Sequence, residues 1–414
     1  MKFENLLERQ LLFFDGAMGT MLQSAGLPAG EAPDVWNLTH PDKVTSVHAA
    51  YLEAGCDVVT TNTFGCTAHK LARTGHSAPR IATAAVRNAR AAIAQAGGRA
   101  RFVALDIGPT GKLLKPLGDL GFEDAFCMFR ETIEAGAAAG ADLVLIETMS
   151  DAYELKAAVL AAKECCTLPV CATVTLDRRG KLLTGGDIAS ITALLEGLRV
   201  DALGFNCGLG PREMLPFLEE LRALSSLPIL LQPNAGLPRE VGGETVFDVN
   251  PDEFAALMED CARRGASLLG GCCGTTPAHI RAHMGDAAGV GRGTVVVATV
   301  QGDVHDIGKN IVKALLENYQ FRVIDLGKDV PPETVVDAAV AHGARLVGLS
   351  ALMTTTVPSM RRTIAALRES APGCLVMCGG AVLTEEYAHD IGADFYVRDA
   401  MESVRRACEV YPGA

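Results

Sequence analysis

Aromatic residues are scarce in this sequence of 414 residues, where they make up 5% of the chain and tryptophan occurs once. Basic residues are also few, because 37 Lys and Arg stand against 49 Asp and Glu, which gives a formal net charge of −12. Surfaces that bind nucleic acid or anionic membranes need clustered Lys and Arg, and no such cluster occurs. We therefore expect no nucleic-acid or membrane partner, and a small-molecule enzyme fits better.

Long hydrophobic runs are absent, since no uncharged apolar stretch approaches the ~20 residues of a membrane-spanning helix. The first residues (MKFEN) lack the basic segment and apolar core of a secretory signal. Thirteen cysteines occur, but the number is odd, and Cys165-Cys166 and Cys272-Cys273 are sequence neighbours. We therefore expect a reduced, cytoplasmic protein whose thiols lie in the core or bind metal, rather than forming disulfides.

The first 284 residues alternate short apolar or β-branched runs with longer alanine-rich stretches of helical period. Eight such units predict an α/β fold, a (β/α)8 TIM barrel whose chemistry lies at the carboxyl ends of its strands. The expected strands are Leu11–Ala17, Asp57–Thr63, Phe102–Ile107, Leu143–Thr148, Val170–Leu176, Ala202–Cys207, Ile229–Pro233 and Ser267–Gly271. Expected helices include Pro41–Ala54, Ala78–Ala96, Glu123–Ala138, Asp151–Cys165, Pro211–Leu224 and Pro251–Arg263.

A second domain is expected after a glycine-rich linker at residues 285–293. Residues 294–414 contain five further strand candidates separated by helical stretches, which predicts a flavodoxin-like (Rossmann-like) doubly wound sheet. Its ligand should lie at the carboxyl ends of the strands. The expected strands are Thr294–Val300, Arg322–Leu326, Leu346–Ala351, Leu375–Cys378 and Phe395–Val397.

Two adjacent cysteines, Cys272 and Cys273, follow the eighth expected strand in the glycine-rich stretch 270–274. Adjacent cysteines are poorly placed to bond each other, but they can present two thiolates to one metal, and Cys207 after the sixth strand is the best candidate for a third. Such a site with one open position would suit zinc and would activate a thiol substrate. The alternative is a pair of small buried hydrophobes at a tight turn, and the residue pattern alone leaves both interpretations open.

Five motifs in the first 284 residues resemble those of the homocysteine S-methyltransferase family. They are DGAMGT at 15–20, TNTFG at 61–65, ET at 147–148, GFNC at 204–207 and GGCCGTTP at 270–277. The resemblance implies a zinc-bearing barrel in which Cys207, Cys272 and Cys273 are the catalytic metal ligands and homocysteine sulfur is the incoming ligand.

The same resemblance implies that Asp15 and Glu147 hold the ammonium group of homocysteine, and two carboxylates suit a buried cation. From the residues alone, Asp15 could instead cap the following turn, and Glu147 could pair with a nearby arginine. Asn234, after the seventh expected strand, is predicted as a weak zinc ligand when substrate is absent.

The stretch GDVHDIGKN at 302–310 directly follows the first strand of the second domain and opens a helix. Its histidine, His305, projects from a loop toward the ligand edge of the sheet, and Asp303 is close enough in sequence to tune its basicity. This favours a metal ligand over a surface histidine. A phosphate loop fits less well, because an aspartate on each side of the histidine would repel phosphate.

The second domain looks like the cobalamin-binding domain of methionine synthase and related corrinoid proteins. That resemblance implies that His305 is the lower cobalt ligand, with Asp303 and Thr356 in a proton relay behind it. It also places Ser350 and Thr354 on the nucleotide tail of cobalamin, and Gly379, Gly380 and Ala400 along its channel. The other motif residues expected at the cofactor are Gly302, Val304, Asp306 and Gly308.

In that family a helical cap, and often a folate domain, separates the two domains, and a reactivation domain follows. Here only the short linker intervenes, and the sequence ends at Ala414. We therefore expect methyl transfer from methylcobalamin to homocysteine, giving methionine, with a methyl-donating methyltransferase or folate protein acting in trans and a separate reductive-activation partner. The alternative is a barrel that uses a sulfonium or betaine donor, or another thiol, beside a domain that is a corrinoid carrier or sensor.

Overall fold

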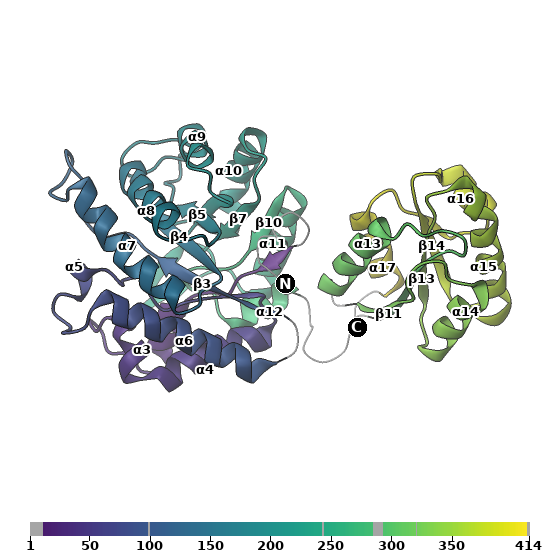
Figure 1. The fold of residues 1–414 in the computed structure, drawn as a ribbon, viewed down its shortest axis with the longest axis horizontal. Helices are drawn as coiled ribbons and strands as arrows, with labels where there is room; N and C mark the ends of the chain where they lie inside the picture. The colour runs from purple at the N-terminus through teal and green to yellow at the C-terminus, as the bar shows by residue number, and fades with distance from the viewer. Residues whose placement is uncertain (1–10, 98–99, 242–243, 285–292, 320, 412–414) are drawn as a thin grey trace. The chain divides into compact units, whose positions relative to one another are not determined.

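The computed structural model describes residues 11–97, 100–241, 244–284, 293–319 and 321–411. The chain divides into two compact units, Met1–His283 and Met284–Ala414 (Figure 1). The predicted linker at 285–293 lies outside the described residues except for Gly293. Among the described helices, none has the length and apolar character needed to cross a membrane.

The first unit is a ring of parallel strands in the order β1-β10-β7-β6-β5-β4-β3-β2. A bridge between Phe14 and Val58 joins β1 to β2 and completes the ring. The predicted TIM barrel is therefore confirmed. Its strands are β1 (Leu12–Phe13), β2 (Val58–Thr60), β3 (Phe102–Ile107), β4 (Leu143–Met149), β5 (Val170–Val174), β6 (Ala202–Asn206), β7 (Ile229–Gln232) and β10 (Ala266–Leu269).

Two details of the strands differ from the prediction. The first strand is shorter than Leu11–Ala17, because the chain leaves the sheet after Phe14 on its way to the helix that begins at Met18. An antiparallel hairpin, β8 (Pro238–Val241) and β9 (Glu244–Phe247), follows β7 and was not predicted. Its first strand begins with a proline and two charged residues, so the sequence lacks the alternation of apolar and polar residues that marks a strand.

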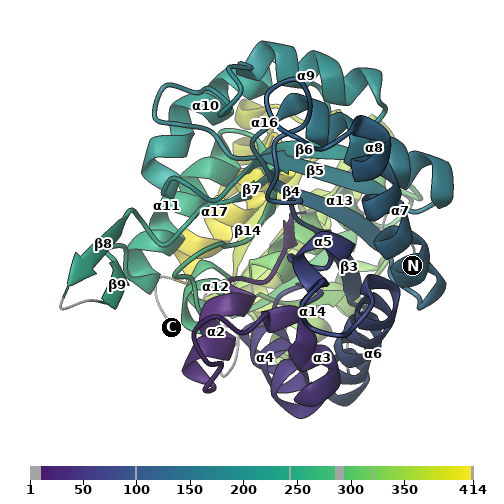
Figure 2. The same cartoon turned by 90° about the vertical axis from the view of Figure 1, so that its left-hand side faces the viewer.

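Helices cover the outside of the barrel, and Figure 2 shows them around the strands. Asp151 caps α8 by accepting a hydrogen bond from Tyr153 N, and Asn250 caps α11 by accepting one from Glu253 N. The helices are α2 (Met18–Ser24), α3 (Trp36–Thr39), α4 (Pro41–Ala54), α5 (Ala68–Leu71), α6 (Ala78–Ala96), α7 (Phe122–Ala138), α8 (Ala152–Cys165), α9 (Ile188–Gly197), α10 (Pro211–Leu224), α11 (Pro251–Arg263) and α12 (Pro277–Met284), with a short 3-10 helix η1 (Pro33–Val35).

The alternation of inward- and outward-facing side chains along each strand determines which side chains reach the mouth of the barrel. Alternate residues of each strand, such as Ala104 of β3, form a buried cluster inside the ring. Because successive side chains of a strand point to opposite faces, Asp106 continues the inward row of β3 at its carboxyl end. The same alternation turns Glu147 and Gln232 inward, each two residues after a member of the cluster, and also Asn206, which is four residues after Ala202. A polar layer therefore tops an apolar core.

The second unit is a parallel sheet in the order β12-β11-β13-β14-β15, which confirms the predicted flavodoxin-like fold. The strands are β11 (Thr294–Thr299), β12 (Arg322–Asp325), β13 (Leu346–Ser350), β14 (Leu375–Gly379) and β15 (Phe395–Tyr396). The helices are α13 (Ile307–Asn318), α14 (Pro332–Ala341), α15 (Val357–Ser370), α16 (Glu385–Asp390) and α17 (Ala400–Val410), with a 3-10 helix η2 (Thr354–Thr356).

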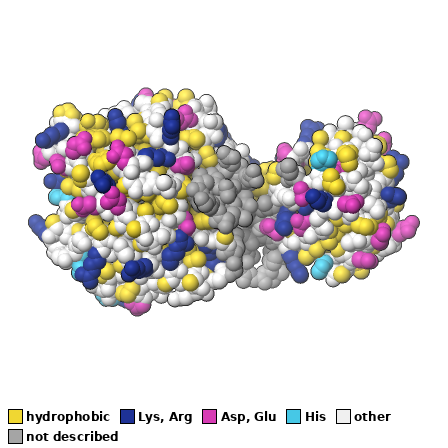
Figure 3. All heavy atoms as spheres, viewed as in Figure 1, with side chains coloured by type: hydrophobic (Ala, Val, Ile, Leu, Met, Phe, Trp, Pro, Cys, Tyr) yellow, Lys and Arg dark blue, Asp and Glu magenta, His cyan; other side chains and the backbone are white. Residues whose placement is uncertain are grey.

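Each face of this sheet has its own apolar core. Val296 and Ala298 of β11 pack in the cluster beneath α14 and α15, while Val295 and Val297 pack in the cluster beneath α13 and α17 (Figure 1). A strand buried on both faces reads as a continuous apolar run, as β11 does. On the face of each unit drawn in Figure 3, basic and acidic side chains both occur rather than one sign alone.

Candidate functional site

Three cysteine thiols converge at the mouth of the barrel. Cys207 directly follows β6, Cys272 and Cys273 follow β10, and the three Sγ atoms all lie within 4.8 Å of one another. The Sγ atoms of Cys207 and Cys273 are 3.8 Å apart. Thiolates at ~2.3 Å from a tetrahedral zinc lie about 3.8 Å from each other, so the spacing fits a zinc site. The structure therefore brings together the thiols that the sequence singled out.

The thiols are accessible and electrostatically coupled. Cys273 is exposed, and Cys207 and Cys272 are half-buried, which does not fit the alternative of core cysteines. Hydrogen bonds with the Cys207 and Cys272 thiols lower the pKa of Cys273, whereas hydrogen bonds with Cys207 and Cys273 raise the pKa of Cys272.

The backbone around the thiols is strained or tightly packed. Thr148 and Cys207 have φ angles of 59° and 58°, a left-handed conformation that costs non-glycine residues roughly 1 kcal/mol or more. A Cβ at Gly271 would collide with the side chain of Thr275, whose hydroxyl donates to the carbonyl of Cys272 at 2.6 Å. The glycines beside the cysteines thus let the loop fold onto itself.

Asp15 and Glu147 line a cavity of about 990 Å3 at the barrel mouth, together with the three cysteines. Burial raises the pKa of Asp15 to about 7 and that of Glu147 to about 8. Asp15 Oδ2 accepts a hydrogen bond from Thr60 N at 2.8 Å rather than capping the following turn. Glu147 makes no ion pair with an arginine among the described residues. Both carboxyls can therefore face a cation in the cavity.

Asn206 links the acid to the thiols, and sequence reasoning gave it no role of its own. Its Nδ2 donates to Thr148 Oγ1 at 2.7 Å and lies 3.4 Å from Glu147 Oε2. Its Oδ1 accepts hydrogen bonds from Thr148 N at 2.7 Å and Thr173 Oγ1 at 2.8 Å. The available signal was its place directly before Cys207. The cavity lining also includes Asp34, Lys70, Asp106 and Gln232, which were not predicted as site residues.

Asn234 lies beside the cysteine loop rather than in the cavity lining. The amide of the next residue, Ala235, donates to the carbonyl of Cys273 at 3.0 Å. The Asn234 side chain is buried, and its Oδ1 has no hydrogen-bond partner among the described residues. Its assignment as a weak zinc ligand stays a prediction.

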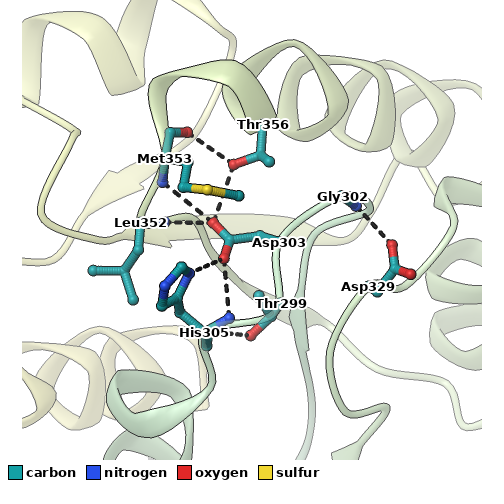
Figure 4. A network of polar contacts seen from close by, with 8 residues as sticks. All are labelled: Thr299, Gly302, Asp303, His305, Asp329, Leu352, Met353 and Thr356. Carbon is teal, nitrogen blue, oxygen red and sulfur yellow. Dashed lines mark hydrogen bonds and ion pairs between the residues drawn. The ribbon is translucent and has the colours of Figure 1, made fainter.

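Asp303 is the centre of a hydrogen-bond network in the second unit (Figure 4). Its Oδ1 lies 3.0 Å from His305 N and 2.8 Å from His305 Nδ1. Its Oδ2 lies 2.7 Å from Leu352 N, 3.3 Å from Met353 N and 3.1 Å from Thr356 Oγ1. Burial alone would raise the pKa of Asp303, but these hydrogen bonds outweigh it and lower the pKa to about 2. Asp303 therefore remains a carboxylate.

This network orients the histidine toward a ligand. The contact with Asp303 engages Nδ1 of His305, and the side chain is 52% exposed, so Nε2 can serve as a metal ligand. Of the other motif residues, Gly302 donates from N to Asp329 Oδ1 at 2.7 Å, Val304 is exposed, and Asp306 directly precedes α13. The arrangement suits a lower ligand to cobalt.

A cavity of about 440 Å3 opens beside this loop at the ends of β13 and β14. The predicted cofactor residues in its lining are Gly308, Ser350, Gly379, Gly380 and Ala400. Thr354 is exposed and Thr356 turns to Asp303, so neither is part of the lining. Lys309, which was not predicted, also lines the cavity and pairs with Asp325 at 2.6 Å.

Comparisons with known proteins follow the same division. The homocysteine S-methyltransferase family model matches residues 12–284, and the B12 binding domain model matches residues 293–409. Methionine synthases from Mycobacterium tuberculosis and Mycobacterium leprae are each 37% identical to this chain, over 67% and 70% of its length. These matches cover 24% and 25% of the two relatives, so the chain spans about a quarter of their length.

A solved structure resembles the first unit. The homocysteine methyltransferase MmuM from Escherichia coli, in its metallated form, gives a TM-score of 0.57 at 27% identity. The match covers 67% of this chain and 96% of that one. The predicted enzyme class, a methyltransferase, is confirmed, and the B12 binding domain supports cobalamin as a cofactor. The chain belongs to the homocysteine S-methyltransferase family and joins that barrel to a B12 binding domain.

Proposed function

We propose that this chain transfers a methyl group from methylcobalamin to the sulfur of homocysteine, giving methionine. One observation carries the proposal: three thiols with zinc-site spacing meet at the mouth of a homocysteine S-methyltransferase barrel that is joined to a B12 binding domain. The barrel would bind and deprotonate the acceptor, and the second unit would hold the methyl carrier.

Cys207, Cys272 and Cys273 would hold zinc, which lowers the pKa of a thiol bound at its open position. The carboxyls of Asp15 and Glu147 would hold the ammonium group of homocysteine at the same cavity. A cation favours their ionised forms, so substrate binding opposes the effect of burial on both pKa values. The chain thereby fixes the sulfur and the amino group of one small molecule at two points.

In the second unit, His305 would bind the cobalt of cobalamin, which supplies an electrophilic methyl group. Asp303 remains ionised and accepts a hydrogen bond from Nδ1 of His305. The hydroxyl of Thr356 donates a second hydrogen bond that holds Asp303 in place. The nucleotide tail would occupy the cavity lined by Ser350, Gly379, Gly380 and Ala400, and we propose that Thr354 contacts the tail at the rim.

Repeated turnover needs a new methyl group on cobalamin, and electrons whenever the cobalt becomes oxidised. We propose that a separate methyltransferase or a folate protein presents the methyl group. We propose that a separate reductive partner supplies the electrons.

The test is methionine formation by the zinc-loaded chain given methylcobalamin and homocysteine. The wild type should form methionine, and Cys272→Ser should lose at least about 100-fold in rate, because second-shell changes alone cost 10–100-fold at metal sites. Cys127→Ser is the matched control, since Cys127 is exposed on α7 and should leave the rate unchanged. Absence of methionine with all variants would defeat the proposal. Methionine formed from a sulfonium donor without cobalamin would favour the alternative donor.

A further inference from the structure

Asp106 is a buried acid at the barrel mouth that the proposed reaction leaves without a role. It is the inward-facing residue near the end of β3, it is 4% exposed, and it belongs to the lining of the large cavity. Its Oδ1 has no hydrogen-bond partner among the described residues. Buried polar atoms in native proteins nearly always have a partner, and leaving one unpaired costs about 1–3 kcal/mol. A ligand in the cavity can supply the missing donor.

The surroundings of Asp106 favour a positively charged donor. Burial first, and then the charges of Glu147 and Asp34, raise the pKa of Asp106. Lys70 is the neighbouring cation, but its Nζ donates to the carbonyl of Pro109 at 2.6 Å and forms no ion pair within the described part of the chain. The cavity thus holds more carboxyls than cations. A bound cation with N–H donors would reduce the repulsion between the carboxylates and donate hydrogen bonds to them.

Two other acids of the cavity each accept one backbone hydrogen bond, which leaves further acceptor positions free, whereas Asp106 Oδ1 accepts none among the described residues. Asp15 accepts from Thr60 N at 2.8 Å, and Asp34 accepts from Gly65 N at 2.9 Å. Asp106 pairs in register with Leu145 on the neighbouring strand, and Glu147 is two residues further along that strand. Both acids therefore project inward as diagonal neighbours on one wall of the barrel.

We propose that Asp106 determines acceptor specificity by binding, together with Asp15 and Glu147, the ammonium group of an amino-acid thiol. This inference rests on the proposed function, because it assumes a thiol acceptor in the barrel. An ammonium group has three N–H donors and can therefore donate to all three carboxyls at once. A thiol without the amino group leaves Asp106 Oδ1 unpaired, and sites built to bind such a donor reject analogues that lack it.

The test compares homocysteine with 4-mercaptobutanoate, which has the same thiol, chain and carboxylate but no amino group. Each is titrated by calorimetry into the zinc-loaded full chain without cobalamin. The wild type should prefer homocysteine, and Asp106→Asn should reduce this preference by about 10-fold or more, because a hydrogen bond to a charged group contributes ~1.5–3 kcal/mol. Asp106→Asn is nearly isosteric, and Asp106→Ala tests the same loss without a replacement amide.

Asp119→Asn is the matched control, because Asp119 is an exposed acid on the loop between β3 and α7. It should keep the wild-type preference. The inference is overturned if Asp106→Asn weakens both thiols equally, if it weakens neither, or if the wild type binds the two thiols alike. Because binding is read without methyl transfer, a protein that discriminates the thiols but forms no methionine would defeat only the proposed function.

Discussion

Replacing Asp303 by asparagine should destabilise the second unit by roughly 2 kcal/mol at pH 7 and leave the barrel unchanged. The hydrogen bonds to Asp303 lower its pKa from the ordinary 3.8 to about 2. That change corresponds to roughly 2 kcal/mol of stabilisation, at ~1.4 kcal/mol per pKa unit. Because the folded pKa is lower than the unfolded one, this stabilisation is complete well above pH ~4 and is lost as the pH falls toward 2.

The single tryptophan separates the two units in the assay. Trp36 is buried in the first unit, so its fluorescence follows the unfolding of the barrel alone, whereas far-ultraviolet circular dichroism follows both units. In urea, Asp303→Asn should shift the unfolding transition of the second unit to lower urea concentration. Circular dichroism detects this transition, and the fluorescence of Trp36 does not. Asp337→Asn is the matched control, because Asp337 is exposed on α14.

The difference in unfolding free energy between wild type and Asp303→Asn should narrow to about half by pH 3. At that pH Asp303 is mostly protonated in the unfolded chain but still ionised in the folded one. The reasoning is refuted if the two proteins unfold alike at pH 7. It is also refuted if the difference stays constant from pH 5 to pH 3, or if the fluorescence transition shifts by the same amount.

Three further changes have defined outcomes. Gly380→Ala should weaken cobalamin binding in a spectral titration, because its φ is 142° and a Cβ would collide with the Ala351 carbonyl. Burial lowers the pKa of His48 to about 4, so relative to His48→Phe the wild-type barrel should lose about 2 kcal/mol of unfolding free energy between pH 7 and 5, measured by fluorescence in urea. Asn206→Ala should raise KM for homocysteine more than it lowers kcat in a methionine-formation assay, because Glu147 loses a neighbouring donor.

Some of the candidate site could be predicted because few chemistries use its residue types. A cysteine pair flanked by glycines and a histidine between two aspartates are compatible with metal binding, and the strand pattern placed both at carboxyl ends. The structure brings Cys207 to Cys272 and Cys273, and Asp303 to His305. The fold class and the sequence position predicted where these residues lie, and the resemblance to known families implied their roles as metal ligands.

The rest could not be predicted for physical reasons. Every residue of β3 is buried, so its sequence carries no alternation to show that Asp106 faces inward. The donors to Asp303 from Leu352 and Met353 are backbone amides, which every residue except proline possesses. Thr354 begins η2, is exposed and lies outside the lining of the second unit's cavity, so its expected contact with the nucleotide tail stays a prediction.

The central claim is that homocysteine sulfur completes a three-cysteine zinc site at the barrel mouth. X-ray absorption at the zinc edge counts the sulfur ligands directly, in the zinc-loaded chain with and without homocysteine. We predict three sulfur ligands without homocysteine and four with it, and one fewer in each state for Cys273→Ala. A sulfur count that does not rise when homocysteine is added, or that Cys273→Ala leaves unchanged, would contradict the account.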